Sequence, residues 1–182
     1  MISIINASPR VNSNSSYFIN LITKKLNDNY RINRIYRDKI EDVIKNINDS
    51  DIIVLVFPLY VDAPPSKLLE LIEQYDCNKN LYVVSNCGFL ESKQNNVATK
   101  IIKNWSKSYF MGSFKTGAGE VLGHDNIISK ILSPFFKYKV YKFVKSINKG
   151  KKVNLSASLI LPKKMFCLCA NHSFKKQIDR YL

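Results

Sequence analysis

The sequence has few of the side chains that metal sites and disulfide frameworks need. It contains only two histidines and four cysteines, and no two cysteines have Cys-x-x-Cys spacing. A structural zinc or an iron–sulfur cluster is therefore not expected. The cysteines are interpreted as reduced thiols, which favours a cytoplasmic protein because disulfides are rare in that compartment. They are Cys77, Cys87, Cys167 and Cys169.

Two glycine-rich phosphate-binding motifs and any long apolar run are also missing. Neither Gly-x-Gly-x-x-Gly nor Gly-x-x-x-x-Gly-Lys-Ser/Thr follows the first apolar segment, which removes most support for a dinucleotide-type Rossmann site or a P-loop hydrolase. The longest apolar run, residues 52–61, contains Pro58 and is too short to cross a bilayer. Polar residues interrupt the N-terminal apolar run, so no signal peptide is expected.

Acidic side chains are nearly absent from the C-terminal part of the chain. The net charge is +14 at pH 7. Residues 1–129 contain 15 basic and 13 acidic side chains, a balance of +2. Residues 130–182 contain 13 basic side chains and a single acidic one, a balance of +12. Nearly all of the positive charge therefore belongs to the C-terminal segment.

Aromatic and lysine residues alternate within this basic segment, at residues 138–145. Three interpretations compete: a nucleic-acid-binding face, a face for an anionic membrane surface, and a solvated or dimer-facing helix in a lysine- and asparagine-rich chain. We favour the third, because amphipathic helices usually bury their apolar face in protein. Nucleic acid is not expected as a partner, and membrane contact through the basic tail is the less favoured alternative.

What the sequence does contain is a repeating order of strand, loop and helix. Apolar runs predict strands at residues 2–6, 31–36, 51–57, 81–85 and 109–114, with helical spacing between them. This order predicts an α/β fold with right-handed βαβ units and a five-stranded parallel sheet. The first helix should end near residues 27–29, and Asp38 should cap the second.

The chain length suits a single domain, residues 1–182. We expect a core at residues 1–125 and a basic helical C-terminal extension at 126–182. A long helix at residues 126–149 should begin this extension and break at Pro134, because proline disrupts a helix interior.

The first strand runs into a turn rich in serine and asparagine, residues 7–16. A helix that starts after such a turn presents free backbone N–H groups and about half a positive charge, where phosphate groups bind well. Arg10 adds a planar charge suited to phosphate oxygens. Serine and asparagine are also the usual N-cap residues, so the turn alone leaves phosphate binding and simple capping as alternatives.

Ligands of open parallel sheets bind at the carboxyl ends of the strands, so the loops there should converge on one crevice. Residues 6–10 with 13–15 resemble the phosphate loop of the flavodoxin-like NAD(P)H-dependent FMN and quinone reductases. Residues 58–68 resemble the second flavin loop of that family, and residues 86–89 stand where its third loop would be. The resemblance covers roughly residues 1–120, and Ala7 stands where a glycine is common.

This resemblance implies the strand order 2-1-3-4-5 and bound FMN. The phosphate would be held by Ser8, Arg10, Asn14, Ser15 and Ser16. The isoalloxazine ring would lie against Pro58, Leu59, Tyr60 and Val61, with its polar edge near Asn86, Gly88 and Phe89. Because the cofactor performs the hydride transfer, no catalytic acid or base is assigned to the protein.

The implied function is that of a cytoplasmic FMN-dependent oxidoreductase. It would take electrons from NADH or NADPH and reduce a quinone, a free flavin or another small electron acceptor. The resemblance also implies a homo-oligomer, such as a homodimer. Two alternatives stay open: a flavodoxin-type electron carrier, and a flavin-free binding protein on the same fold that uses its basic tail.

Overall fold

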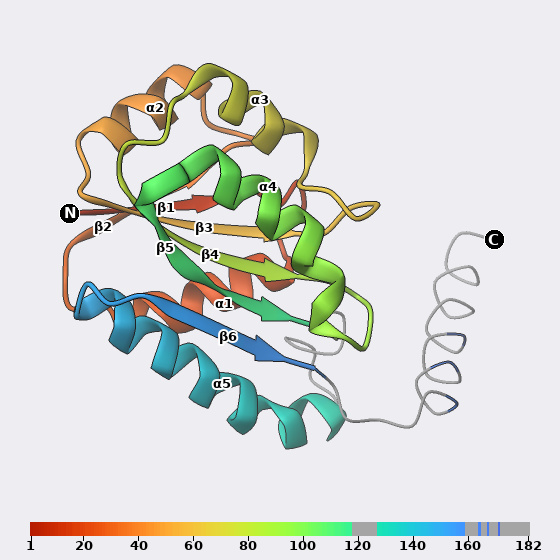
Figure 1. The fold of residues 1–182 in the computed structure, drawn as a ribbon. Helices are drawn as coiled ribbons and strands as arrows, with labels where there is room; N and C mark the ends of the chain where they lie inside the picture. Colours follow the sequence, from red (N-terminus) through yellow and green to blue (C-terminus); the bar gives the residue numbers. More distant parts are fainter. Residues whose placement is uncertain (118–126, 159–163, 165–166, 168–170, 172–182) are drawn as a thin grey trace.

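The computed structural model describes residues 1–117 and 127–158, together with Lys164, Cys167 and Asn171. The chain forms an open parallel sheet with helices on both faces (Figure 1). The strands are β1 (Ile2–Asn6), β2 (Tyr30–Arg34), β3 (Ile52–Pro58), β4 (Asn80–Asn86), β5 (Phe110–Thr116) and β6 (Val153–Ala157). The helices are α1 (Asn14–Thr23), α2 (Ile40–Asn48), α3 (Ser66–Gln74), α4 (Asn96–Ser106) and α5 (Ile127–Asn148), with short 3₁₀ turns η1 (Ser92–Asn95) and η2 (Lys107–Tyr109).

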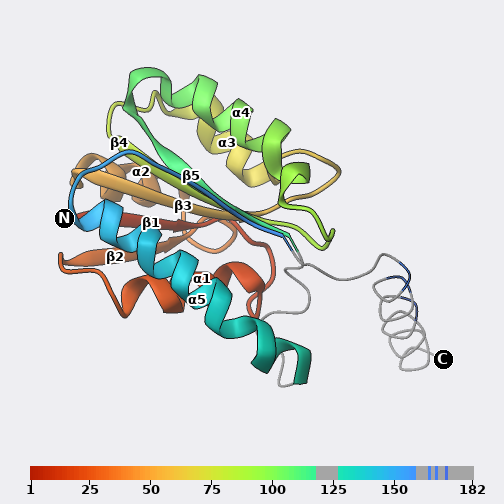
Figure 2. The same cartoon turned by 60° about the horizontal axis from the view of Figure 1, so that its bottom comes forward.

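Two apolar layers enclose the sheet. Helices α1 and α5 cover one face, and α2, α3 and α4 cover the other (Figures 1 and 2). Alternate residues of β3 point to opposite layers: Val54 and Val56 pack under α1 and α5, while Leu55 and Phe57 pack under the other helices. Burial on both faces explains why the central strands are continuous apolar runs.

The sheet has six strands where the sequence predicted five. Its order is β2-β1-β3-β4-β5-β6, so the predicted order is confirmed for the first five strands. The sixth, β6, lies within residues 126–182, for which the sequence predicted a helical extension. In β6 the more buried Val153, Leu155 and Ala157 alternate with exposed Asn154 and Ser156. Five residues with a single covered face give a weak apolar signal, and this is why the strand was missed.

Helix α5 is continuous through Pro134, where the sequence predicted a break. Its buried side chains, which include Phe136, Val140 and Phe143, pack against the sheet beside α1. Pro134 lies on the exposed side of the helix. A proline costs one intrahelical hydrogen bond, and the packing of the buried face offsets that loss. Of the helices in the described part of the chain, none is both long and apolar enough to span a bilayer.

Two helix ends differ from the predicted positions. α1 ends at Thr23 rather than near residues 27–29, because the N–H groups of Lys25 and Leu26 both bond to the Ile22 carbonyl and tighten the last turn. Asp38 does not cap α2: Lys39 occupies the N-cap, and a carboxylate oxygen of Asp38 accepts a bond from the Arg34 N–H at 2.6 Å. The predicted boundary between residues 125 and 126 falls outside the described residues. Beyond residue 158, the structure describes only Lys164, Cys167 and Asn171.

Candidate functional site

The turn between β1 and α1 is shaped by hydrogen bonds from its own polar side chains. The Oδ1 atom of Asn6 accepts a bond from the Ser8 N–H at 3.1 Å, and the Ser8 hydroxyl accepts one from the Arg10 N–H at 3.3 Å. Such side-chain turns replace backbone pairing at the point where β1 leaves the sheet. Asn6 was not among the predicted site residues, although a polar residue ending a buried strand is a recognisable turn signal.

At the start of α1, a row of backbone donors has no acceptor among the residues that the structure describes. Ser13 is the N-cap, and its hydroxyl accepts a bond from the Ser16 N–H at 3.2 Å. The Ser16 hydroxyl donates to the Val11 carbonyl at 3.0 Å and so holds the turn closed. No acceptor within the described residues bonds to the N–H groups of residues 11–15. With the positive end of the helix dipole, this row is suited to an anion.

A buried hydrogen bond joins this turn to the neighbouring strands. The side-chain amide of Asn86, at the end of β4, donates to the Ser15 hydroxyl at 3.1 Å and to the Phe57 carbonyl at 3.0 Å. Two predicted site residues, Ser15 and Asn86, are therefore in direct contact. Both are almost fully buried, so their contact fixes the position of α1 against β3 and β4.

The loop after β3 forms a tight hairpin at the same edge of the sheet. Tyr60 and Ala63 exchange both backbone hydrogen bonds, at 3.0 and 2.9 Å. Val61 and Asp62 between them have φ of 46° and 60°, in the left-handed region, which a β-branched residue such as valine rarely adopts. The Val61 side chain is 99% exposed. The hairpin therefore holds an apolar side chain in solvent at a cost in backbone strain.

The side chain of Asn95 holds the loop after β4 in place. The sequence did not single out this residue. Its fully buried side-chain amide lies 3.3 Å from the Cys87 sulfur and 3.1 Å from the Thr116 carbonyl. A Cβ on Gly117 would lie 2.3 Å from the Leu90 carbonyl oxygen, so glycine permits the close approach of β5's end to this loop. Burial raises the pKa of the Cys87 thiol. Cys87 therefore acts as a packed, neutral side chain rather than a nucleophile.

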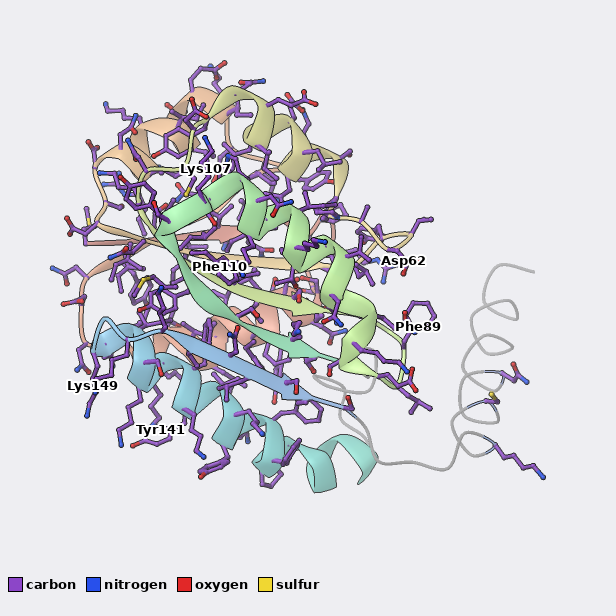
Figure 3. The ribbon with its side chains drawn as sticks, viewed as in Figure 1. Asp62, Phe89, Lys107, Phe110, Tyr141 and Lys149 are labelled. Atoms are coloured by element: carbon purple, nitrogen blue, oxygen red, sulfur yellow. The ribbon has the colours of Figure 1, made fainter. Side chains whose placement is uncertain are left out.

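The three loops lie at one edge of the sheet, where β1, β3 and β4 end. Figure 3 shows Asp62 and Phe89 at this edge, on neighbouring loops. The predicted site residues divide by exposure. Ser8, Ser15 and Asn86 are buried, Asn14, Ser16, Pro58, Leu59 and Gly88 are partly buried, and Arg10, Tyr60, Val61 and Phe89 are exposed. The structure brings the three predicted loops together and leaves Arg10 and Val61 extended into solvent.

The chemistry of the turn after β1 fits a phosphate group. Residues 7–16 contain no carboxylate, and their single charged side chain is the guanidinium of Arg10. Free backbone N–H groups, serine hydroxyls and one arginine form a set of donors without a competing negative charge. Beside it, exposed Tyr60, Val61 and Phe89 offer apolar surface for a flat ring.

Comparisons with known proteins identify the fold. No family model and no curated protein sequence matches the chain. Among solved structures, an FMN-dependent NADH-azoreductase from Bacillus anthracis in complex with FMN is similar with a TM-score of 0.58 and 14% identity, over 81% of this chain and 99% of the other. An NAD(P)H:quinone oxidoreductase from Methanothermobacter marburgensis has a TM-score of 0.62 and 12% identity, over 80% and 94%.

A flavodoxin from Streptococcus pneumonia TIGR4 is similar to the same degree. Its TM-score is 0.58 at 12% identity, over 82% of this chain and 98% of the flavodoxin. Identities this low establish the fold and leave the activity open. The flavodoxin-like parallel α/β fold predicted from the sequence is confirmed, with six strands in place of five.

Proposed function

We propose that the protein is an FMN-dependent oxidoreductase that uses NADH or NADPH to reduce a quinone, a free flavin or another small electron acceptor. The observation that carries this proposal is the row of N–H groups at residues 11–15, which have no acceptor in the described part of the chain. This row follows β1, and the apolar hairpin follows the neighbouring parallel strand β3. A phosphate-bearing, flat cofactor requires these two features side by side. The azoreductase and quinone oxidoreductase described above supply the reaction class.

In this proposal the turn after β1 holds the FMN phosphate through its backbone donors, Ser8, Asn14 and Arg10. The ring rests on residues 58–61, and backbone groups of residues 86–89 contact its polar edge. When bound, FMN supplies the hydride chemistry, so the protein's part is to bind, orient and shield the ring. The exposed apolar side chains at this edge favour a homo-oligomer in which a second copy covers the ring.

The proposal is tested by the absorption spectrum of the isolated protein and by titration with FMN. Tyr60→Ala should raise the Kd for FMN about tenfold, because it removes an aromatic contact worth roughly 1–1.5 kcal/mol. Tyr30→Ala is the matched control, since Tyr30 is also exposed but begins β2 at the opposite edge of the sheet. A colourless protein that takes up no FMN would contradict the proposal and leave a flavin-free binding protein.

A second candidate, a one-electron carrier, is favoured by the similarity to a flavodoxin. Anaerobic mixing with NADH or NADPH separates the two candidates. A reductase should lose its flavin absorbance on mixing at a rate that rises with the nucleotide concentration. A carrier should stay oxidised until a protein donor or dithionite is added.

A further inference from the structure

The outer face of α5 combines exposed aromatic rings with lysines. It carries three aromatic rings and three lysines, and all of these side chains are exposed except that of Lys139, which is half-buried. We call this set the α5 outer face: Phe135, Tyr138, Lys139, Tyr141, Lys142 and Lys145. The three rings are between 43% and 53% exposed, while the apolar side of the helix is buried against the sheet. The exposed rings are therefore not needed to hold α5 in place.

Each exposed ring is paired with a lysine one helical turn further on. The Nζ atoms of Lys139, Lys142 and Lys145 lie 5.5, 4.7 and 6.0 Å from the ring centres of the aromatic residues four positions earlier. The nearby ammonium of Lys142 lowers the pKa of the Tyr138 hydroxyl. Residues 127–158 contain eight lysines and no acidic residue, so this segment itself supplies no carboxylate that could neutralise the surface.

A pocket of about 350 Å³ continues this face at the C-terminal end of α5. It is lined by Lys25, Asn27, Tyr141, Val144, Lys145, Asn148 and Lys149. Asn148 joins the end of α5 to the segment after α1. Its side-chain amide donates to the Lys25 carbonyl at 3.0 Å, and its Oδ1 accepts a bond from the Asn27 N–H at 3.3 Å. Among the described residues, the pocket lining contains three lysine ammonium groups and no carboxylate. Figure 3 shows Lys149 at the end of the molecule opposite Asp62 and Phe89, so the pocket is separate from the candidate flavin site.

The sequence favoured a solvated or dimer-facing helix, but the exposed rings and the adjoining pocket favour the membrane alternative. We propose that the α5 outer face docks on an anionic lipid bilayer, with a headgroup phosphate in the pocket beside Lys145. The α5 outer face spans residues 135–145, about 16 Å at the usual helical rise, so its lysines and aromatic rings form one ridge along the helix that can lie flat on a membrane. Tyrosine and phenylalanine rings flanked by lysine suit the headgroup layer, where the ring is partly apolar and the ammonium meets phosphate. The occupant is a bilayer because the positive charge of the lysines and the exposure of the three rings both suit an anionic headgroup layer.

A nucleic acid fits this face less well. Residues 127–158 contain no arginine, the side chain that binds phosphate in a bidentate manner. The lysines already lie over the rings, so a base would have to displace an ammonium group in order to stack. A single convex helix also provides no groove that could follow a strand.

The test is co-sedimentation of the full chain with vesicles at low ionic strength, with no added flavin. The vesicles contain phosphatidylcholine alone or equal parts of phosphatidylcholine and phosphatidylglycerol. The variant Lys139→Gln/Lys142→Gln/Lys145→Gln should partition about 100-fold less than the unaltered protein, since each lysine near an anionic surface contributes about fivefold. The matched control is Lys39→Gln/Lys100→Gln/Lys103→Gln, which removes the same charge from exposed positions on α4 and before α2.

Binding to the anionic vesicles that is lost in the α5 variant and kept in the control would support the proposal. Equal binding by the two variants, equal binding to neutral vesicles, or no vesicle binding at all would overturn it. So would binding only to a single-stranded oligonucleotide. Circular dichroism of each variant verifies that it is folded. None of these readouts depends on FMN, so the outcome is independent of the proposed reductase activity.

Discussion

At the scale of single residues, the hairpin after β3 combines backbone strain with an exposed apolar side chain. Val61 is fully in solvent, yet it is held at a φ of 46° that costs a β-branched residue roughly 1–2 kcal/mol. Asn and Gly are the residues that such a turn favours. A valine at this position gains nothing from packing against the described part of the chain. The strain is explained if Val61 contacts the ring of a bound cofactor or substrate.

Replacing Val61 should therefore separate stability from binding. Val61→Asn should stabilise the fold by about 1 kcal/mol, because asparagine tolerates the left-handed conformation. The same variant should weaken FMN binding, because it removes an apolar contact with the ring. Urea unfolding and FMN titration measure the two effects. Val97→Asn is the control, since Val97 is an exposed valine on α4 and should change neither quantity by more than about 0.5 kcal/mol.

An unchanged or lowered free energy of unfolding in Val61→Asn would contradict the strain argument. An unchanged FMN affinity would remove Val61 from the binding surface.

At the scale of elements, the sixth strand extends the sheet beyond β5 and completes the core under α5. β6 pairs with β5 through Gly112, which lies opposite Val153 in the register. A Cβ on Gly112 would lie 1.7 Å from the Val153 carbonyl oxygen, and Gly112 also has a φ of 137°. Only glycine lets the two strands approach this closely.

Gly112→Ala should therefore loosen β6 specifically. We expect a loss of about 3 kcal/mol in the free energy of unfolding, from overpacking together with backbone strain. Gly150→Ala is the matched control: Gly150 also has a positive φ, of 60°, but a Cβ there meets nothing within 4 Å. The free energy of unfolding of Gly150→Ala should fall by only about 1 kcal/mol. Backbone amides of residues 153–157 should exchange hydrogen faster in Gly112→Ala than in the unaltered protein, and at an unchanged rate in Gly150→Ala. Equal exchange rates in the two variants would refute the argument.

At the scale of the whole molecule, the two apolar layers also enclose groups that release protons at high pH. Burial raises the pKa of Tyr75 to about 12, with a smaller contribution from the charge of Cys77. Burial also raises the pKa values of Cys77, Cys87 and Tyr82. The folded protein therefore keeps these protons at pH values where the unfolded chain loses them. The corresponding stability is complete below about pH 8.5 and falls as the pH rises further.

The free energy of unfolding should accordingly decrease from about pH 8.5 to pH 11, with the cysteines contributing first and the tyrosines later. Tyr75→Phe should make this decrease less steep above pH 10, because it removes one of the protons involved. Tyr109→Phe, at an exposed tyrosine, should leave the steepness unchanged. Urea unfolding at a series of pH values measures the slope. A slope in Tyr75→Phe equal to that of the unaltered protein would show that burial of Tyr75 does not control its ionisation.

The sequence alone determined the order of the elements and the edge of the sheet that carries the candidate site. Apolar periodicity is a local property, so it can be read from the sequence. Parallel strands joined by right-handed crossovers bring the loops after β1, β3 and β4 to one edge of the sheet, independently of how the side chains pack. The serine- and asparagine-rich turn was therefore recognisable before the structure. The contacts of individual residues with FMN stay predictions.

Only the tertiary structure decided the features that depend on residues far apart in the chain. Asn148 meets Lys25 across 123 positions, and Asn86 meets Ser15 across 71. The close approach of Gly112 to Val153 and of Gly117 to Leu90 makes those glycines necessary, although neither has a local sequence signal. The sixth strand and the pocket at the end of α5 arise in the same way. Periodicity specifies which face of an element is apolar, but the distance between two faces is set only when they pack.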